Sequence, residues 1–192
     1  VAIAAPLTKY SATITDGERI NEFVDRAVKI ATNGYPGAVH LSLPVDIMFS
    51  HFAEDAGRDE RPFDLSMQLL ARAWPEPARL QKMLQKLNAA KRPVLIGGHG
   101  VWWAKAEAKL EEAGRLLGIP VFNIPYHQKL LGEECEAYMG LADIHQYHPS
   151  ADAFRDADLV LMVGGRLDNQ MNFGNPPLFP SSAELVCVNG SH

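Results

Sequence analysis

Two short apolar runs that end in paired glycines constrain the fold of this chain most. Residues 94–100 read VLIGGHG and residues 160–166 read VLMVGGR, and similar apolar runs lie at 119–124 and 183–190. Such continuous runs are typical of strands that are covered on both faces of a parallel sheet. Between them lie helical stripes, at 80–90, 104–117 and 151–155. We therefore predict an α/β fold: an open parallel sheet with helices on both faces, of Rossmann-like type.

The first part of the chain carries a second, shorter α/β pattern. Thr15 and Glu18 have the spacing of a capping box, and an amphipathic stripe follows at 20–31. Asn33-Gly34 predicts the end of that helix. The alternating AVHLSL at 38–43 predicts a strand.

The segment between these two patterns is charged, aperiodic and rich in proline. It covers residues 49–77, with one or two helical turns predicted around 66–73. We therefore predict three segments: the end of a first domain at 1–48, an interdomain linker at 49–77, and a central α/β domain, truncated at its C-terminal end, at 78–192.

Composition narrows the range of partners. The chain is 47% apolar with a net charge of −5, which disfavours nucleic acid and acidic membrane surfaces. No apolar run reaches the ~20 residues that span a bilayer, and we interpret the apolar stretch 1–6 as too short and uncharged for a signal peptide. Cys135 and Cys187 form no metal pattern, so we predict two buried, reduced thiols in a cytoplasmic protein.

The glycine clusters are the candidate binding site. In open parallel sheets, ligands bind beyond the carboxyl ends of the strands, and glycines there let a ligand approach the peptide N–H groups. An arginine adds a planar charged group suited to phosphate. The predicted nucleotide contacts are Gly98, His99, Gly100, Gly164, Gly165 and Arg166. The alternative is that both clusters are only tight strand-to-helix turns.

Other candidate sites are weaker. An NAD fingerprint would need a glycine where Trp103 stands and an acidic residue where Asn123 stands. His145 and His148 lack further metal ligands and are interpreted as solvated or capping side chains. Trp102 and Trp103 beside the glycine turn either stack on a ligand ring or pack under a loop. Three acidic side chains are interpreted as surface charge: Glu133, Glu134 and Asp143.

Three ordered motifs carry a family resemblance. The stretch TKYSATITDGERINEFVDRAVKIATNGYPGAVHLSLPVDI at 8–47 resembles the end of the amino-terminal, pyrimidine-binding domain of thiamine-diphosphate-dependent enzymes of the acetolactate synthase type. NAAKRPVLIGGHG and DADLVLMVGGRLD resemble two signatures of that family's central domain. FGNPPLFP is most similar to the acetolactate synthase-like and 2-hydroxyacyl-CoA lyase branch. Ala38 and Asn189 depart from the pattern, replacing a proline and an acidic residue.

The resemblance implies a thiamine-diphosphate- and Mg²⁺-dependent lyase or transferase. Such an enzyme makes or breaks a C–C bond next to the carbonyl of a small 2-oxo acid or 2-hydroxyacyl substrate. The family's catalytic glutamate would lie upstream of Val1 and its G-D-G…N motif downstream of His192. We therefore expect missing N- and C-terminal domains of the same chain, no catalytic residue in this segment, and no activity of the segment alone.

The family's central domain binds FAD in some members, an ADP moiety in others, and nothing in several. For this chain, FAD or ADP at the glycine clusters and an architectural domain without a nucleotide both stay open. The resemblance also implies a homodimer or homotetramer. An alternative of a different class is a free-standing FAD- or NAD-binding module of electron transfer.

Overall fold

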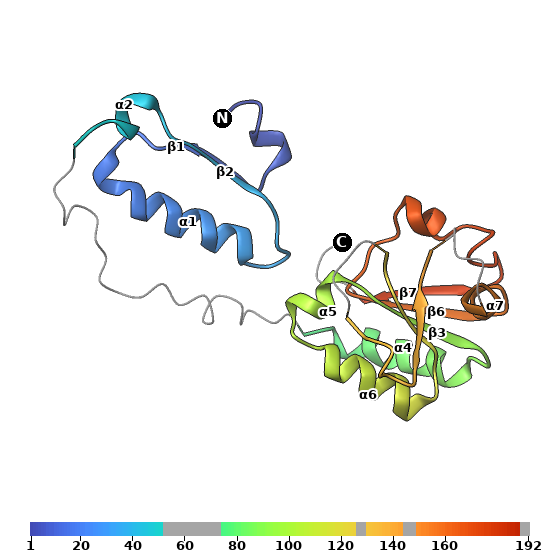
Figure 1. The fold of residues 1–192 in the computed structure, drawn as a ribbon. Coiled ribbons are helices and arrows are strands. Elements are labelled where there is room, and N and C mark those ends of the chain that lie inside the picture. The colour runs from blue at the N-terminus through green and yellow to red at the C-terminus, as the bar shows by residue number, and fades with distance from the viewer. Residues whose placement is uncertain (52–73, 126–129, 144–148, 189–192) are drawn as a thin grey trace. The chain divides into compact units, whose positions relative to one another are not determined.

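The chain forms two compact units in a computed structural model that describes residues 1–51, 74–125, 130–143 and 149–188. The units are Val1–Ala73 and Trp74–His192, and Figure 1 draws the ribbon of both. The division falls inside the predicted linker at 49–77. The limits predicted for the three segments stay predictions, and the helical turns predicted around 66–73 lie outside the described residues.

The first unit is a two-stranded parallel sheet with one long helix. β1 (Tyr10–Thr13) pairs with β2 (Val39–Ser42), and α1 (Ile20–Thr32) connects them. The helix and the second strand were predicted, whereas β1 was not. The described residues of this unit also form three shorter helical segments, η1 (Ala5–Leu7), η2 (Gly17–Arg19) and α2 (Val45–Met48).

Polar contacts fix both ends of the helical stretch. The Asp16 carboxylate, not the predicted Thr15 hydroxyl, caps its start by accepting from the N–H of Glu18 at 3.0 Å. Past its end, Nζ of Lys9 donates to the carbonyl oxygens of Asn33 (2.7 Å) and Tyr35 (2.9 Å). The lysine of the TKYS motif therefore satisfies carbonyl groups at the end of α1.

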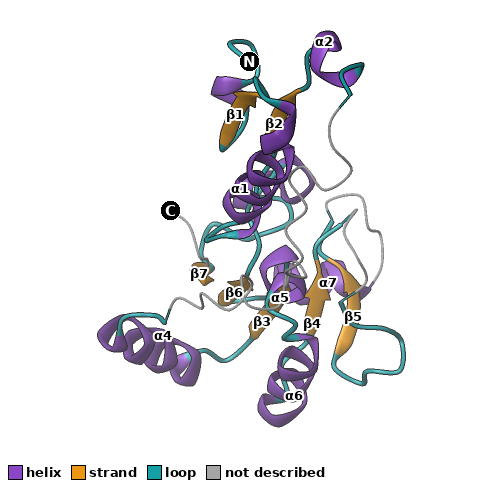
Figure 2. Cartoon of the chain, turned by 90° about the vertical axis from the view of Figure 1, so that its left-hand side faces the viewer, coloured by secondary structure: helices purple, strands orange, loops and turns teal. Residues whose placement is uncertain are grey.

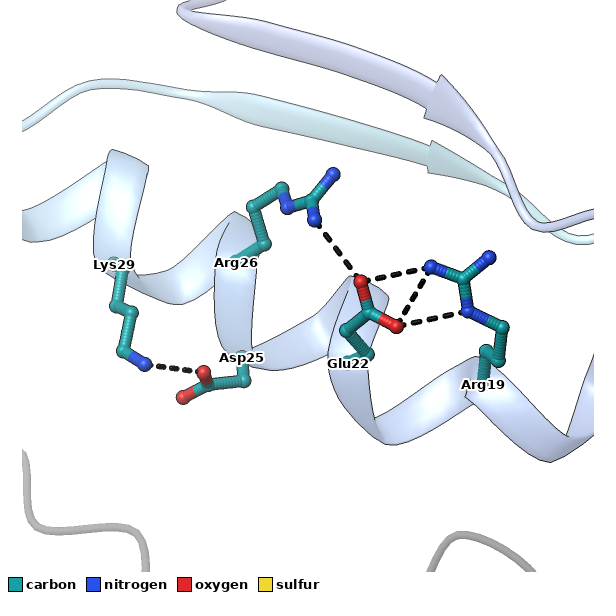
Figure 3. A network of polar contacts seen from close by, with 5 residues as sticks. All are labelled: Arg19, Glu22, Asp25, Arg26 and Lys29. Carbon is teal, nitrogen blue, oxygen red and sulfur yellow. Dashed lines mark hydrogen bonds and ion pairs between the residues drawn. The ribbon is translucent and has the colours of Figure 1, made fainter.

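The exposed face of this helix carries a run of ion pairs, shown in Figure 3. Glu22 accepts from Arg19 at 2.8 Å and from Arg26 at 3.0 Å, and Lys29 pairs with Asp25. All five side chains are well exposed, so each pair adds only about 0.3–0.5 kcal/mol to helix stability.

The second unit contains a five-stranded parallel sheet. Figure 2 shows its strands side by side. The order is β5-β4-β3-β6-β7, and each neighbouring pair is parallel. The strands are β3 (Pro93–Gly97), β4 (Val121–Asn123), β5 (Tyr138–Leu141), β6 (Leu159–Val163) and β7 (Glu184–Val188).

Helices cover both faces of this sheet, which confirms the predicted fold class. Val101 and Leu110 pack with Leu95 on one face, and Phe154 and Met171 pack with Ile96 on the other. The first face carries α4 (Pro77–Ala89), α5 (His99–Trp103) and α6 (Glu107–Leu117). The second carries α7 (Pro149–Arg155) and η3 (Asn169–Gly174).

Three details of the second unit differ from expectation. The helix predicted over 104–117 begins only at Glu107, because Lys105 takes a φ of 50° and separates it from α5. The strand β5 was not predicted, since its sequence YMGL has no apolar run. Cys135 is buried as predicted, but Cys187 is exposed on β7, which among the described strands lies at one end of the sheet, next to β6.

A single carboxylate joins the starts of two central strands. Asp158, just before β6, accepts hydrogen bonds from the N–H groups of Lys91 (2.7 Å) and Arg92 (2.9 Å), just before β3. These backbone hydrogen bonds hold the pKa of Asp158 below its ordinary value. The KRP and DADL sequences therefore meet at the amino edge of the sheet.

Candidate functional site

The carboxyl ends of β3 and β6 flank the point where the strand order reverses. From β3 the chain builds outward through β4 and β5, then returns to place β6 on the other side of β3. Ligands of doubly wound sheets bind at this reversal. The six residues predicted as nucleotide contacts all lie here, in the two connections that follow these strands. Residues 98–100 are the N-cap and first turn of α5 after β3, and residues 164–166 are in the loop after β6.

The glycines of the two loops lie against one another. A Cβ on Gly98 would stand 2.4 Å from Cα of Gly165, and one on Gly100 would stand 2.7 Å from Cα of Gly164. Real Cβ atoms do not approach backbone so closely, so at these positions the close neighbour that excludes a side chain is the other loop. We call residues 98–100 and 164–165 together the glycine latch.

Hydrogen bonds close the glycine latch. The N–H of Gly98 donates to the carbonyl of Val163 at 2.9 Å, and the N–H of Gly100 donates to the carbonyl of Gly164 at 2.7 Å. The N–H of Gly164 donates to the carbonyl of Val188 at 2.8 Å. These three donors are satisfied within the protein, so a phosphate at this edge would depend on other groups.

The two predicted contacts that have side chains, His99 and Arg166, differ in solvent exposure. Arg166 is exposed, and His99 is half-buried at the start of α5. A guanidinium at a sheet's carboxyl edge suits a phosphate, so this edge fits a nucleotide through its side chains rather than through the latch amides. The assignment of these residues as nucleotide contacts stays a prediction.

Asn123 cannot take the role of the acidic residue that it replaces. It ends β4 but is only 2% exposed, and its Nδ2 donates to the carbonyl of Leu131 at 3.1 Å. Its Oδ1 has no hydrogen-bond partner among the residues that the structure describes. Burial raises the pKa of the neighbouring Tyr138 hydroxyl, a hydrogen bond with Asn123 lowers it, and the charge of Glu133 raises it. This amide is part of the sheet's interior, out of reach of a ribose.

The loop after β6 contains a feature that the sequence did not indicate. In η3, Asn172 and Phe173 have φ values of 48° and 53°, and Gly174 follows at 83°. We call these three residues the left-handed turn. An asparagine and a glycine tolerate this region of φ, but nothing in the sequence signals that a phenylalanine between them would adopt it.

The other candidate groups make no second site. Among the described residues, no group of three His, Cys, Asp or Glu side chains could hold a metal ion. His145 and His148 lie outside the described residues. Trp102 and Trp103 stack edge to face with ring centroids 4.9 Å apart, and Glu133 and Glu134 are exposed. Within the described part of the chain, no helix is long and apolar enough to cross a membrane.

The fold and this edge define a doubly wound α/β domain, and comparison with known proteins gives its family. The family model described as the thiamine pyrophosphate enzyme central domain matches residues 80–192, more than half of the chain. The chain therefore belongs to the thiamine pyrophosphate enzymes, as the sequence motifs predicted.

Individual relatives agree with this assignment. The chain is 26% identical over 189 residues to the acetolactate synthase large subunit of Cyanidium caldarium, covering 97% of this chain and 32% of that protein. It is 26% identical over 175 residues to 2-hydroxyacyl-CoA lyase 1 of Dictyostelium discoideum, covering 91% of this chain and 29% of that protein. The chain thus spans about a third of the length of the curated relatives it matches.

A solved structure supports the fold alone. The thiamine diphosphate-dependent 4-hydroxybenzoylformate decarboxylase of Rhodococcus jostii RHA1 matches with a TM-score of 0.67 at 19% identity, covering 98% of this chain and 35% of that one. The match extends over both units of this chain.

Proposed function

We propose that the whole protein is a thiamine-diphosphate- and Mg²⁺-dependent lyase or transferase. It makes or breaks a C–C bond next to the carbonyl of a 2-oxo acid or 2-hydroxyacyl compound. The observation that carries this proposal is the central-domain match over residues 80–192, together with relatives named acetolactate synthase and 2-hydroxyacyl-CoA lyase. Thiamine diphosphate supplies the electron sink for such chemistry when it is bound.

The test is an assay of the protein expressed from its complete reading frame. We expect turnover of pyruvate or of a 2-hydroxyacyl-CoA that requires thiamine diphosphate and Mg²⁺. Failure with both substrate classes in a protein that binds thiamine diphosphate would contradict the proposed reaction.

For the 192-residue chain itself we propose the architectural and binding roles of a central domain, without catalysis. Among the described residues, the pKa values of Tyr138, Asp158 and Cys187 are shifted. Tyr138 lies on β5, Asp158 directly before β6, and Cys187 on β7, so the three groups form no acid–base pair. Measured turnover of pyruvate by this chain with thiamine diphosphate and Mg²⁺ would overturn the proposal.

We further propose that the β3–β6 edge binds a nucleotide, FAD or the ADP moiety of a larger ligand. The strand reversal and the exposed Arg166 support it, and the occupied amides of the glycine latch limit it to side-chain and outer contacts. Calorimetric titration with FAD and with ADP tests it. Micromolar binding of either supports the site, and binding of neither leaves the architectural role alone.

The assembly proposed for the whole protein is a cytoplasmic homodimer or homotetramer. In the first unit several large apolar side chains are exposed, which is the composition expected of surfaces that other parts of an assembly cover. They are Ile3, Leu7, Val45, Met48 and Phe49. Light scattering of the full-length protein gives the stoichiometry directly, and a monomer at micromolar concentration would contradict it.

A further inference from the structure

The turn that joins α1 to β2 contains an asparagine followed by a glycine, Asn33-Gly34. In such a pair the glycine nitrogen can attack the asparagine side chain, because no Cβ shields that nitrogen. Both residues are exposed, and a Cβ on Gly34 would meet nothing within 4 Å. Among the hydrogen bonds of the described residues, none involves the N–H of Gly34 or the side chain of Asn33. The two groups that would react are therefore accessible.

Attack by this nitrogen converts the asparagine into an acid. The Gly34 nitrogen bonds to Cγ of Asn33, the Cγ–Nδ2 bond breaks, and the side-chain nitrogen leaves as ammonia, taking up the amide proton of Gly34. Water then opens the five-membered imide at one of its two carbonyl groups. Opening at the side-chain carbonyl leaves aspartate, and opening at the main-chain carbonyl leaves isoaspartate, in which the chain runs through Cγ. Either product adds a negative charge to the turn.

The backbone of Asn33 is held away from the reactive geometry. Ring closure requires the Gly34 nitrogen to rotate about the Cα–C bond of Asn33 until it lies beside Cβ, whereas Asn33 has an extended ψ of 135°. The N–H of Asn33 donates to the carbonyl of Lys29 at 3.0 Å, which fixes its amino side to the end of α1. The rotation therefore has to move the peptide group between Asn33 and Gly34, together with its carbonyl oxygen.

That carbonyl oxygen is bound by Lys9. Nζ of Lys9 donates to the carbonyl oxygens of Asn33 at 2.7 Å and of Tyr35 at 2.9 Å. One ammonium group thus holds a carbonyl on each side of Gly34. Hydrogen bonds from a charged donor are stronger than neutral ones, so rotation of the Asn33 carbonyl away from Lys9 is opposed by the loss of such a bond.

Contacts along the chain and the stem of Lys9 place its ammonium group. The N–H of Lys9 donates to the carbonyl of Ala38 at 2.8 Å, and Cδ of Lys9 lies where a Cβ on Gly37 would be only 2.8 Å away. We propose that Asn33 is a site of spontaneous deamidation and that Lys9 restrains the reaction by holding the carbonyl that has to move. Formation of isoaspartate would turn this carbonyl into a carboxylate and lengthen the backbone of the turn.

Deamidation rates in matched variants of the protein expressed from its complete reading frame test the restraint. Lys9→Met removes the ammonium group but keeps a long stem, and Lys9→Arg keeps a charged donor. Lys29→Met is the control, because the Lys29 side chain pairs with Asp25 (Figure 3) and the substitution keeps the carbonyl that Asn33 binds. Peptide mapping by mass spectrometry follows Asn33 and separates it from the other Asn-Gly pair, at 189–190. Circular dichroism and thermal unfolding establish which variants are folded.

A charge-assisted hydrogen bond at the surface is worth enough for about threefold in rate or more. We expect Asn33 to deamidate at least about threefold faster in Lys9→Met than in wild type, with Lys9→Arg and Lys29→Met within about twofold of wild type. Folded wild type should also react more slowly than wild type unfolded in urea.

An equal or slower reaction in folded Lys9→Met overturns the restraint and leaves the deamidation site standing. Equal rates for folded and unfolded wild type overturn the restraint as well, whether or not Lys9→Met folds. Absence of product at Asn33 in every sample, unfolded wild type included, overturns the site itself.

Discussion

The N–H of Gly100 donates to the carbonyl oxygen of Gly164 at 2.7 Å, across a contact in which neither residue could carry a Cβ. This contact joins the first turn of α5, which follows β3, to the loop after β6. The two glycine clusters that the sequence displays separately are therefore one structural element. The sequence suggested that these glycines leave space for a ligand. The structure offers another explanation, because the space beside each glycine segment is filled by the other segment.

Alanine substitutions at three glycines, two in the glycine latch and one outside it, distinguish the energetic cost of backbone strain from that of steric contact. Gly118 has a φ of 63° with open space around it, so Gly118→Ala should lower the free energy of unfolding by about 1 kcal/mol. Gly98 has an ordinary φ of −124° but no space, so Gly98→Ala should lower it by about 2–3 kcal/mol. Gly164→Ala combines both penalties and should be the most destabilising.

Urea unfolding followed by tryptophan fluorescence measures these differences in the second unit. All three tryptophans, Trp74, Trp102 and Trp103, belong to it. Equal losses for Gly98→Ala and Gly118→Ala would mean that the loops separate easily, contrary to the contact described.

Asp158 should make the second unit sensitive to acid. Its pKa is lowered in the folded state by the N–H groups of Lys91 and Arg92, relative to about 3.9 for an unfolded aspartate. Its stabilising contribution is therefore complete above about pH 4 and is lost as the pH falls through the lower folded pKa. Asp158→Asn should be less stable than wild type at pH 7 and should lose less stability on acidification.

Urea midpoints at pH 7 and pH 3 give the comparison. Asp152→Asn is the control, because the Asp152 carboxylate pairs only with the exposed side chain of Arg155 among the contacts described. Parallel pH profiles for wild type and Asp158→Asn would show that the two backbone hydrogen bonds do not depend on the carboxylate charge.

Relief of strain at Phe173 should stabilise the protein. Asparagine tolerates the left-handed region, and the exposed ring contributes little burial, so Phe173→Asn should raise the unfolding free energy by up to about 1 kcal/mol. Phe173→Leu keeps the strain and should bring no gain. A destabilised Phe173→Asn variant would mean that the ring makes stabilising contacts of its own.

The two cysteines should react differently with a thiol reagent. Cys135 is buried, whereas Cys187 is exposed on β7, so the native chain should show one accessible thiol. Partial burial raises the pKa of the Cys187 thiol, so its reaction should be slow at pH 7 and accelerate above pH 9. Cys187→Ser should abolish the native reaction, and modification of Cys135 in the folded Cys187→Ser variant would contradict the burial described.

The parts of the fold that the sequence predicted are those with strong local signals. β3, β4, β6 and β7 follow continuous apolar runs, and α4 covers nearly all of the predicted stripe at 80–90. β5 has a glycine and an exposed methionine in four residues, so no run identifies it. Its place depends on pairing with β4, which a local pattern does not encode.

Prediction of the candidate site from sequence had the same limit: local positions could be predicted, but contacts between distant residues could not. The sequence indicated where the glycines lie, at the carboxyl ends of two adjacent strands, but a glycine does not say which atoms approach it. That information depends on residues 60 or more positions away, as with Gly98 and Gly165. The turn at Phe173 was missed for a related reason, since the hydrogen bonds of Asp168 and Asn172 override the residue's own preference.

The glycine latch also restricts how this edge of the domain can change over evolutionary time. When a side chain in a packed core grows, a smaller residue opposite can restore the fit. Gly98 faces Gly165 and Gly100 faces Gly164, and glycine has no side chain to shorten. No second substitution within the pair can compensate the first, so variation at this edge has to enter through the residues on either side, such as His99 and Arg166.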